Sequence, residues 1–192
     1  MAEERPLVVV IAGPNGAGKS TTAPRLLQGP LGVAEFVNAD TIARGMSAFH
    51  PESVAVAAGR VMLARLRALA EAREHFAFET TLAGRNFAPW LTGLRASGYW
   101  VDLAFVSLPD PEMAVERVQA RTRSGGHNVE PEVVRRRFQR GLGNFFNLYR
   151  LLVDSWQIYD NSTMTELRLV ASGEPLRVRY EAVWENLLRR AQ

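Results

Sequence analysis

A phosphate-binding loop is the strongest chemical signal in this sequence. Residues 13–20 read Gly-Pro-Asn-Gly-Ala-Gly-Lys-Ser and match the pattern G-x-x-x-x-G-K-[ST]. The backbone N–H groups of such a loop, together with the N-terminus of the helix behind it, form a nest for phosphate oxygens. The residues expected to contact the nucleotide are Gly13, Pro14, Asn15, Gly16, Ala17, Gly18, Lys19, Ser20 and Thr21.

Lys19 is the one lysine of the chain, since every other residue among its 23 lysines and arginines is an arginine. A compact ammonium on a flexible stem can lie between the β- and γ-phosphates, whereas a planar guanidinium is wider and more rigid. We therefore predict that Lys19 is a catalytic cation and that the Ser20 hydroxyl is a metal ligand. The expected cofactors are ATP and Mg²⁺.

Two later strand ends supply candidate carboxylates. Asp40 ends a short predicted strand at 35–40, and Glu79 lies near the end of a predicted strand at 76–80. A carboxylate there can take the proton from a hydroxyl that attacks the γ-phosphate, or hold the metal through water. For Asp40 the alternative is a helix N-cap, because helix-like residues follow it. For Glu79 the alternative is an exposed edge strand, because a buried carboxylate is costly unless it is partnered.

Arginines gather on two predicted helices joined by Gly125-Gly126-His127. They are Arg117, Arg121, Arg123, Arg135, Arg136, Arg137 and Arg140. Guanidinium groups match phosphoryl oxygens, so this pattern predicts an arginine-bearing helical lid over about 121–140. The alternative is a solvated basic face paired with Glu116, Glu130 and Glu132. His127 is predicted to hydrogen-bond within the lid rather than to bind metal, because the other histidines show no ligand spacing with it.

The elements that must position these residues alternate along the chain. Strands are predicted at 7–12, 35–40, 76–80, 100–108 and 156–160. Helices are predicted from 20 to 28, and at 50–74, 87–97, 111–123 and 131–154, the last loosened near Gly141 and Gly143. A late hairpin at 166–170 and 176–180 precedes a C-terminal helix. This order predicts one α/β domain over 1–192, with a mostly parallel five-stranded sheet covered by helices on both faces.

Composition narrows the class of protein. The chain has 192 residues, no cysteine and a net charge of +3, which excludes disulfide frameworks and cysteine nucleophiles and does not by itself imply a nucleic-acid surface. No apolar run reaches the roughly 18 residues of a membrane span. Met1-Ala2-Glu3-Glu4-Arg5 is charged and not typical of a signal peptide. We expect a cytoplasmic protein without a membrane partner.

The ordered motifs resemble those of the zeta-toxin family of P-loop kinases, and in particular its compact bacterial branch. They are the loop at 13–22, Val37-Asn38-Ala39-Asp40, Phe78-Glu79-Thr80-Thr81-Leu82, Arg121 with Gly125-Gly126-His127, Arg136-Arg137-Phe138 and Ile158-Tyr159-Asp160-Asn161-Ser162. The resemblance implies a three-layer P-loop kinase fold and Asp40 as the general base. It also implies substrate contacts at Glu79 and Thr81, and phosphate-clamping arginines at Arg121 and Arg137.

Zeta toxins phosphorylate UDP-N-acetylglucosamine and are held inactive by a small antitoxin. The resemblance therefore implies transfer of the γ-phosphate of Mg-ATP to the hydroxyl of a small molecule, such as a UDP-sugar or a nucleotide, with a small antitoxin as protein partner. His127 is counted with the substrate-binding residues.

Three other functions fit parts of the pattern. Ser124-Gly125-Gly126-His127 imitates the signature of ABC transporter ATPases, but the basic segment at 131–135 follows it instead of an apolar strand ending in Asp-Glu. A nucleic-acid-directed kinase is disfavoured because the aromatic residues near the arginines fall at helical spacing and read as core. A nucleotide-binding regulatory ATPase without transfer activity stays open.

Overall fold

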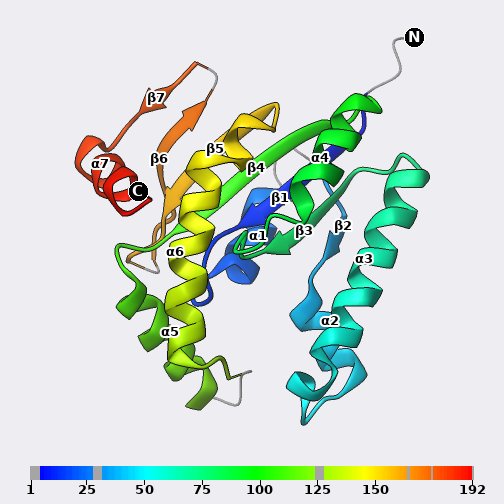
Figure 1. Cartoon of the computed structure of the whole chain (residues 1–192), viewed down its shortest axis with the longest axis horizontal. Helices are drawn as coiled ribbons and strands as arrows, with labels where there is room; N and C mark the ends of the chain where they lie inside the picture. The colour runs from blue at the N-terminus through cyan, green and yellow to red at the C-terminus, as the bar shows by residue number, and fades with distance from the viewer. Residues whose placement is uncertain (1–4, 28–31, 124–127, 164, 174, 192) are drawn as a thin grey trace.

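A twisted sheet forms the centre of the molecule (Figure 1). The computed structural model describes residues 5–27, 32–123, 128–163, 165–173 and 175–191. In these residues the sheet has seven strands in the order β2-β3-β1-β4-β5-β6-β7. The strands are β1 Leu7–Ala12, β2 Glu35–Val37, β3 Phe76–Thr80, β4 Trp100–Ser107, β5 Ser155–Asp160, β6 Arg168–Gly173 and β7 Arg177–Val178. The mixed α/β fold with helices on both faces of the sheet is as predicted.

The prediction of five strands is wrong for the described part of the chain. The first five strands are parallel, but the C-terminal hairpin joins the same sheet in antiparallel orientation. Its first strand pairs with β5 from Trp156↔Gly173 to Asp160↔Arg168. Without this pairing, the outer edge of β5 would expose unpaired N–H and C=O groups. The hairpin was predicted as an element, but not as part of the sheet.

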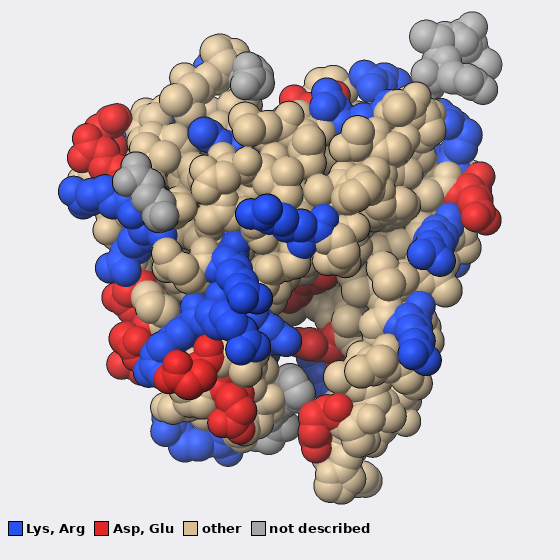
Figure 2. Space-filling model, viewed as in Figure 1, with Lys and Arg blue, Asp and Glu red and all other residues tan. Residues whose placement is uncertain are grey.

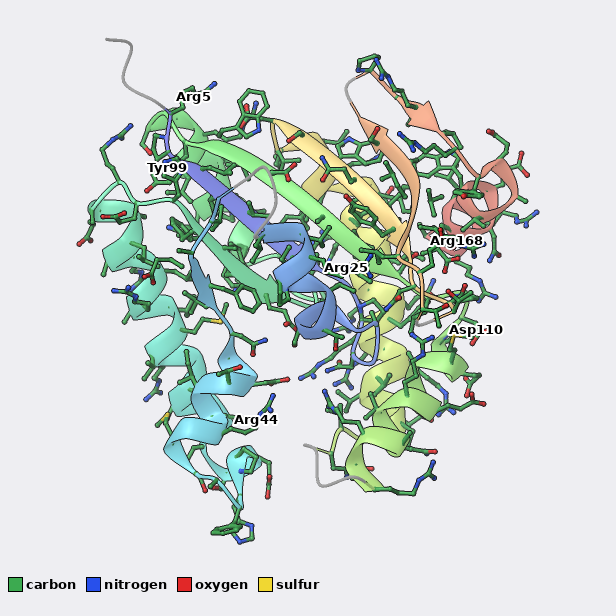
Figure 3. All side chains as sticks on the ribbon, turned by 180° about the vertical axis from the view of Figure 1, so that it is seen from behind. Arg5, Arg25, Arg44, Tyr99, Asp110 and Arg168 are labelled. Carbon is green, nitrogen blue, oxygen red and sulfur yellow. The ribbon has the colours of Figure 1, made fainter. Side chains whose placement is uncertain are left out.

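The helices follow the predicted order with shifted ends. They are α1 Lys19–Leu27, α2 Ala39–Met46, α3 Ala55–Glu71, α4 Phe87–Ala96, α5 Pro111–Arg123, α6 Pro131–Asn147 and α7 Glu181–Arg190. The predicted helix at 50–74 begins as a 3₁₀ turn, Pro51–Val54, and α-helix starts only at Ala55. Asp110, labelled in Figure 3, accepts a hydrogen bond of 2.8 Å from Met113 N and so caps the start of α5.

Two predictions about α6 are wrong. The helix ends at Asn147 rather than 154, because Leu148 leaves helical geometry (φ −138°, ψ −67°) and a 3₁₀ turn, Tyr149–Leu151, leads into β5. The helix also continues through Gly141 and Gly143 without a break. A Cβ at Gly141 would overlap the carbonyl oxygen of Thr81, so this glycine allows α6 to lie against the loop after β3.

Alternating residues of the central strand divide the core between the two faces of the sheet. Val8 and Val10 point into the cluster formed with α3, α4 and α6. Val9 and Ile11 point to the other face, where Ala23 and Leu27 of α1 cover them. Figure 3 shows this second face, with α1 in front of the sheet. Strands buried on both faces explain why 7–12 reads as a continuous apolar run.

The sheet brings the predicted site residues to one edge. In the register of the parallel strands, Ala12 pairs with Thr80 of β3 and Phe105 of β4. The loops after β1, β2, β3 and β5 therefore emerge together, as ligand-binding loops do in open α/β sheets. No helix in the described ranges is long and apolar enough to cross a membrane.

Candidate active site

The loop between β1 and α1 has the geometry of a phosphate nest. Gly16 and Gly18 adopt φ values of +77° and +82°, which side-chain-bearing residues rarely adopt. A Cβ on Gly16 would lie 2.6 Å from the carbonyl oxygen of Ala114, and one on Gly18 would lie 2.6 Å from Nδ2 of Asn161. The positive φ therefore favours glycine at both positions, and at Gly16 the neighbouring backbone also leaves no room for a Cβ.

Lys19 is buried under this loop, with 6% of its side chain exposed. Its Nζ donates to the carbonyl oxygen of Pro14 at 2.9 Å and lies 3.5 Å from Oε1 of Glu79. Burial lowers the pKa of Lys19, while the charges of Glu79 and Asp40 oppose that shift. A planar guanidinium is wider and more rigid than an ammonium, so at this buried position lysine and arginine are not equivalent.

Ser20, Glu79 and Asn38 form a hydrogen-bonded group beside Lys19. Ser20 Oγ donates to Glu79 Oε2 at 2.6 Å, and Asn38 Nδ2 donates to the same oxygen at 2.6 Å. Nδ2 also lies 3.3 Å from Ser20 Oγ. Glu79 is thus partnered, at 12% exposure, and is not on an exposed edge strand.

The chemistry of this group fits Mg²⁺. A hydroxyl and a carboxylate oxygen are the hard ligands that Mg²⁺ prefers, and the ion keeps several waters or phosphate oxygens when it binds. No group of three or more His, Cys, Asp or Glu side chains in the described part of the chain could enclose a metal by itself. Ser20 and Glu79 would hold Mg²⁺ together with the phosphates of a nucleotide.

Asp40 is not the cap of the helix that contains it. Asn38 is the N-cap of α2, since its Oδ1 accepts from the backbone N of Asp40 at 2.8 Å and of Thr41 at 3.1 Å. Asp40 instead lies in the first turn and lines a cavity that it shares with Lys19. Arg44, labelled on α2 in Figure 3, donates to the backbone carbonyl of Asp40 at 3.4 Å. The N-cap alternative is therefore wrong.

A cavity of about 470 Å³ opens above these residues. Lys19, Asp40, Glu79 and Thr81 lie on one side of it, and arginines of α6 lie on the other. Figure 2 shows basic side chains gathered over α6 beside a hollow that contains acidic side chains. Its apolar wall includes Met62 of α3 and Phe87 of α4. Thr80 at the end of β3, with Ala83 and Gly84 of the loop that follows, completes the lining.

The arginines of the predicted lid separate into different positions. Arg136, Arg137 and Arg140 line the cavity, and Arg137 Nη1 donates to Oδ1 of Asn15 in the phosphate loop at 3.4 Å. Arg121 lies in the last turn of α5, close enough for its charge to lower the pKa of Lys19. His127 lies outside the described residues.

Two other arginines of the cluster have structural partners. Arg117 donates to the carbonyl oxygens of Asn161 and Ser162 at 2.9 and 2.8 Å. Arg135 pairs with Glu112 at 2.8 Å and with Glu132 at 2.6 Å. The basic-face alternative is thus correct for Arg135, although its partner on α5 is a glutamate that the sequence did not single out.

Two asparagines of the site were not predicted. Asn38 joins the cap of α2 to Glu79 and Ser20, and Asn161 Nδ2 donates to the carbonyl oxygen of Ala17 at 2.8 Å. Both are buried, at 5% and 6% exposure. Asn38 lies within the predicted strand at 35–40, but β2 ends at Val37 and α2 begins at Ala39. An asparagine directly before a helix is a capping signal that could have identified it.

Proteins of known structure share this fold. A chain of the AvrRxo1-ORF1:-ORF2 complex with ATP gives a TM-score of 0.74 at 16% identity, covering 96% of this chain and 64% of that chain. A chain from the PezAT chromosomal toxin-antitoxin system of Streptococcus pneumoniae gives 0.69 at 15% identity, covering 97% and 80%. At such identities the likeness shows the fold alone, a mixed α/β fold with a central sheet between helices. The present chain spans less than two thirds of the AvrRxo1 complex chain.

Sequence similarity covers the same region. An uncharacterized protein of Haemophilus influenzae is 25% identical over 130 residues, which is 68% of this chain and 91% of that protein. Residues 8–148 match the sequence profile of the AAA_33 family, described as an AAA domain. This segment contains the phosphate loop, both candidate carboxylates and all of α6. The chain therefore belongs to the AAA domain family AAA_33.

Proposed function

We propose that this protein is a cytoplasmic Mg-ATP-dependent kinase of the compact zeta-toxin type, which phosphorylates a hydroxyl of a small molecule. The observation that carries the proposal is the shared cavity. Lys19 and Glu79 of the nucleotide side and Asp40 line the same space, and cationic side chains of α6 face them. Nucleotide binding uses the phosphate loop and the metal-side carboxylate, so the second carboxylate, Asp40, is available as a general base.

The roles follow from position. Lys19 and Arg137, which contacts the loop through Asn15, neutralise charge on the triphosphate, and Arg121 supplements them. The oxygen of the acceptor hydroxyl bonds to the γ-phosphorus, and Asp40 accepts the proton that this hydroxyl loses. The bond from the γ-phosphorus to the β–γ bridging oxygen breaks at the same time. Mg²⁺, when bound at Ser20 and Glu79, supplies charge neutralisation on the phosphates. Thr81 and Glu79 orient the acceptor, and His127 also contacts it in this proposal.

The positions of two arginines favour a phosphate acceptor that carries an anionic group of its own. Arg136 and Arg140 are four residues apart on one face of α6, and both line the cavity. Neither has an ion pair with a carboxylate in the described ranges, unlike Arg135. A diphosphate group of the acceptor can bind both guanidinium groups while a hydroxyl elsewhere in the same acceptor molecule reaches Asp40. This favours a UDP-sugar or a nucleotide over a neutral sugar.

The test is transfer of label from γ-labelled ATP to a panel of UDP-sugars, nucleosides, nucleotides and short RNAs. We expect label in an anionic small molecule, and expect Asp40→Asn to lower transfer about 100-fold or more while ATP affinity stays within about twofold. Asp40→Asn leaves the α2 cap in place, because Asn38 makes it. Label in RNA would favour the nucleic-acid-directed kinase, and hydrolysis without transfer would favour the regulatory ATPase.

The fold likeness to a chain of the PezAT toxin-antitoxin system supports one further part of this proposal, a small antitoxin partner. Isolation of the protein from its own cells, followed by mass spectrometry of what remains bound in gel filtration, tests that part. A monomer of the mass of this chain alone would contradict it.

A further inference from the structure

Asn38 is the buried residue that connects the three parts of the candidate site. It lies between β2 and α2, in extended geometry (φ −135°, ψ 121°), with 5% of its surface exposed. From there its side chain reaches α2 in one direction and the ends of α1 and β3 in the other.

The oxygen and the nitrogen of this side-chain amide bind different partners. Oδ1 accepts from the backbone N of Asp40 at 2.8 Å and from that of Thr41 at 3.1 Å, which is an N-cap interaction. Nδ2 donates to Glu79 Oε2 at 2.6 Å and lies 3.3 Å from Ser20 Oγ. A cap alone requires only the acceptor, which serine or aspartate also provides. The donor half is therefore available for a second role.

We infer that Asn38 is a positioning residue, which sets the distance between the base helix and the metal-side pair Ser20 and Glu79. Glu79 has two hydrogen-bond donors at 2.6 Å, and one of them, Ser20, is itself a proposed metal ligand. When Ser20 turns to the metal, Asn38 is the donor that still holds the carboxylate. The inference rests on the proposed function for its catalytic part, but not for its effect on metal-dependent nucleotide binding.

Geometry explains why other side chains cannot replace the asparagine. Serine and threonine offer an oxygen to the cap but are one atom shorter and do not reach Glu79. Aspartate keeps the cap and places a second carboxylate oxygen against Glu79 Oε2, where a donor is needed. Outer partners of metal ligands typically change affinity or activity 10- to 100-fold when they are lost.

The test separates the two ends of the side chain. Asn38→Ala removes both, whereas Asn38→Ser keeps the cap. We expect Asn38→Ala to lower Tm by about 2–4 °C and Asn38→Ser to leave it nearly unchanged. Both should lower transfer by about 10- to 100-fold, and both should reduce by about tenfold the factor by which Mg²⁺ strengthens ATP binding in calorimetry.

Asp110→Ala is the matched control, since Asp110 caps α5 outside the candidate site. It should lower Tm as Asn38→Ala does, with transfer and magnesium dependence unchanged. If Asn38→Ser restores transfer and magnesium dependence to wild-type values, Asn38 is only a cap and the inference is wrong. If wild-type protein transfers phosphate to nothing, the proposed function fails, but the magnesium dependence of ATP binding still decides the role of Asn38. Asn38→Asp, which keeps the cap, gives the same expected loss of transfer should Asn38→Ser not fold.

Discussion

Replacement of Glu79 by glutamine should strengthen metal-free ATP binding while it weakens phosphate transfer. In the free protein, Glu79 contacts Lys19, the proposed phosphate ligand, and Ser20, the proposed Mg²⁺ ligand. Its Oε1 lies 3.5 Å from Lys19 Nζ, and its Oε2 accepts from Ser20 Oγ at 2.6 Å. Without Mg²⁺, the phosphates of ATP must compete with the carboxylate for Lys19 and are repelled by it. Glutamine has nearly the same shape and carries no charge.

The size of the effect follows from Coulomb's law. Two unit charges 3.5 Å apart attract by about 1 kcal/mol in water and by about 5 kcal/mol at an effective dielectric constant of 20. Lys19 and Glu79 are only 6% and 12% exposed, so screening by water is incomplete. Since each 1.4 kcal/mol is a factor of ten, even the lower limit gives roughly fivefold tighter binding of metal-free ATP.

Calorimetric titration with ATP, first in the presence of a chelator and then with excess Mg²⁺, measures the affinity for metal-free ATP and for Mg-ATP. We expect Glu79→Gln to bind metal-free ATP at least about fivefold more tightly than wild type. With Mg²⁺ present the gain should disappear, because the metal has lost a ligand. Glu112→Gln is the control, since Glu112 is an exposed partner of Arg135 and lies outside the cavity. Unchanged or weaker metal-free binding by Glu79→Gln would refute the competition between the carboxylate and the phosphates.

Three further predictions concern other residues. Lys19→Arg should weaken ATP binding by roughly 10- to 100-fold in calorimetry, although the charge is kept, because a planar guanidinium is wider and more rigid than the buried ammonium that it replaces; unchanged affinity would refute it. Asn161→Ala should weaken ATP binding about tenfold, because it leaves the carbonyl of Ala17 without its donor, and a Kd within twofold of wild type would count against it. Burial raises the pKa of Asp102 above its ordinary value of 3.8. Between that value and the raised pKa of the native state, the native state binds more protons than the unfolded state, so the free energy of unfolding falls as pH rises. Asp102→Asn should abolish that fall in urea unfolding between pH 4 and 7, and an unchanged slope would contradict the assignment.

The nucleotide side of the site could be predicted from sequence because its pattern is local. The loop at 13–20 lies between a doubly buried strand and a helix, and each part has its own signal. The same reasoning placed Glu79 near a strand end, and the structure adds that this strand pairs with β1 and that Glu79 contacts Lys19. It could not show that Ser20 and Asn38 hold Glu79, since those bonds join residues 59 and 41 positions apart.

The ambiguity of Asp40 had a physical origin. Asn38 and Asp40 are both good cap residues, and they are two positions apart. A helix that began two residues later, at Thr41, would have had Asp40 as its N-cap, and the carboxylate would then bind backbone N–H groups. The choice depends on where β2 ends, and pairing with β3 stops at Val37. Strand pairing therefore freed Asp40 for the cavity.

The arginines were harder to assign because helix periodicity defines faces but not neighbours. Arg135 and Arg136 are adjacent and point about 100° apart on the helix. Only the tertiary structure places Glu112 of α5 beside the first and the cavity beside the second. The pairing of the C-terminal hairpin with β5 and the early end of α6 were missed for the same reason, since each depends on what packs against the element.

Helix α6 connects the nucleotide side and the acceptor side of the cavity. Near its start Arg137 contacts Asn15 of the phosphate loop. Near its end Asn144 donates to the carbonyl of Leu82 at 2.8 Å, and Leu82 has a φ of +54°, a conformation that costs about 1–3 kcal/mol in a residue other than glycine. Any movement of α6 toward a nucleotide must therefore either carry the loop at 81–84 with it or break the bond that holds Leu82. If α6 closes as a lid, the acceptor side of the cavity is reshaped in the same step, and acceptor affinity should depend on whether ATP is bound.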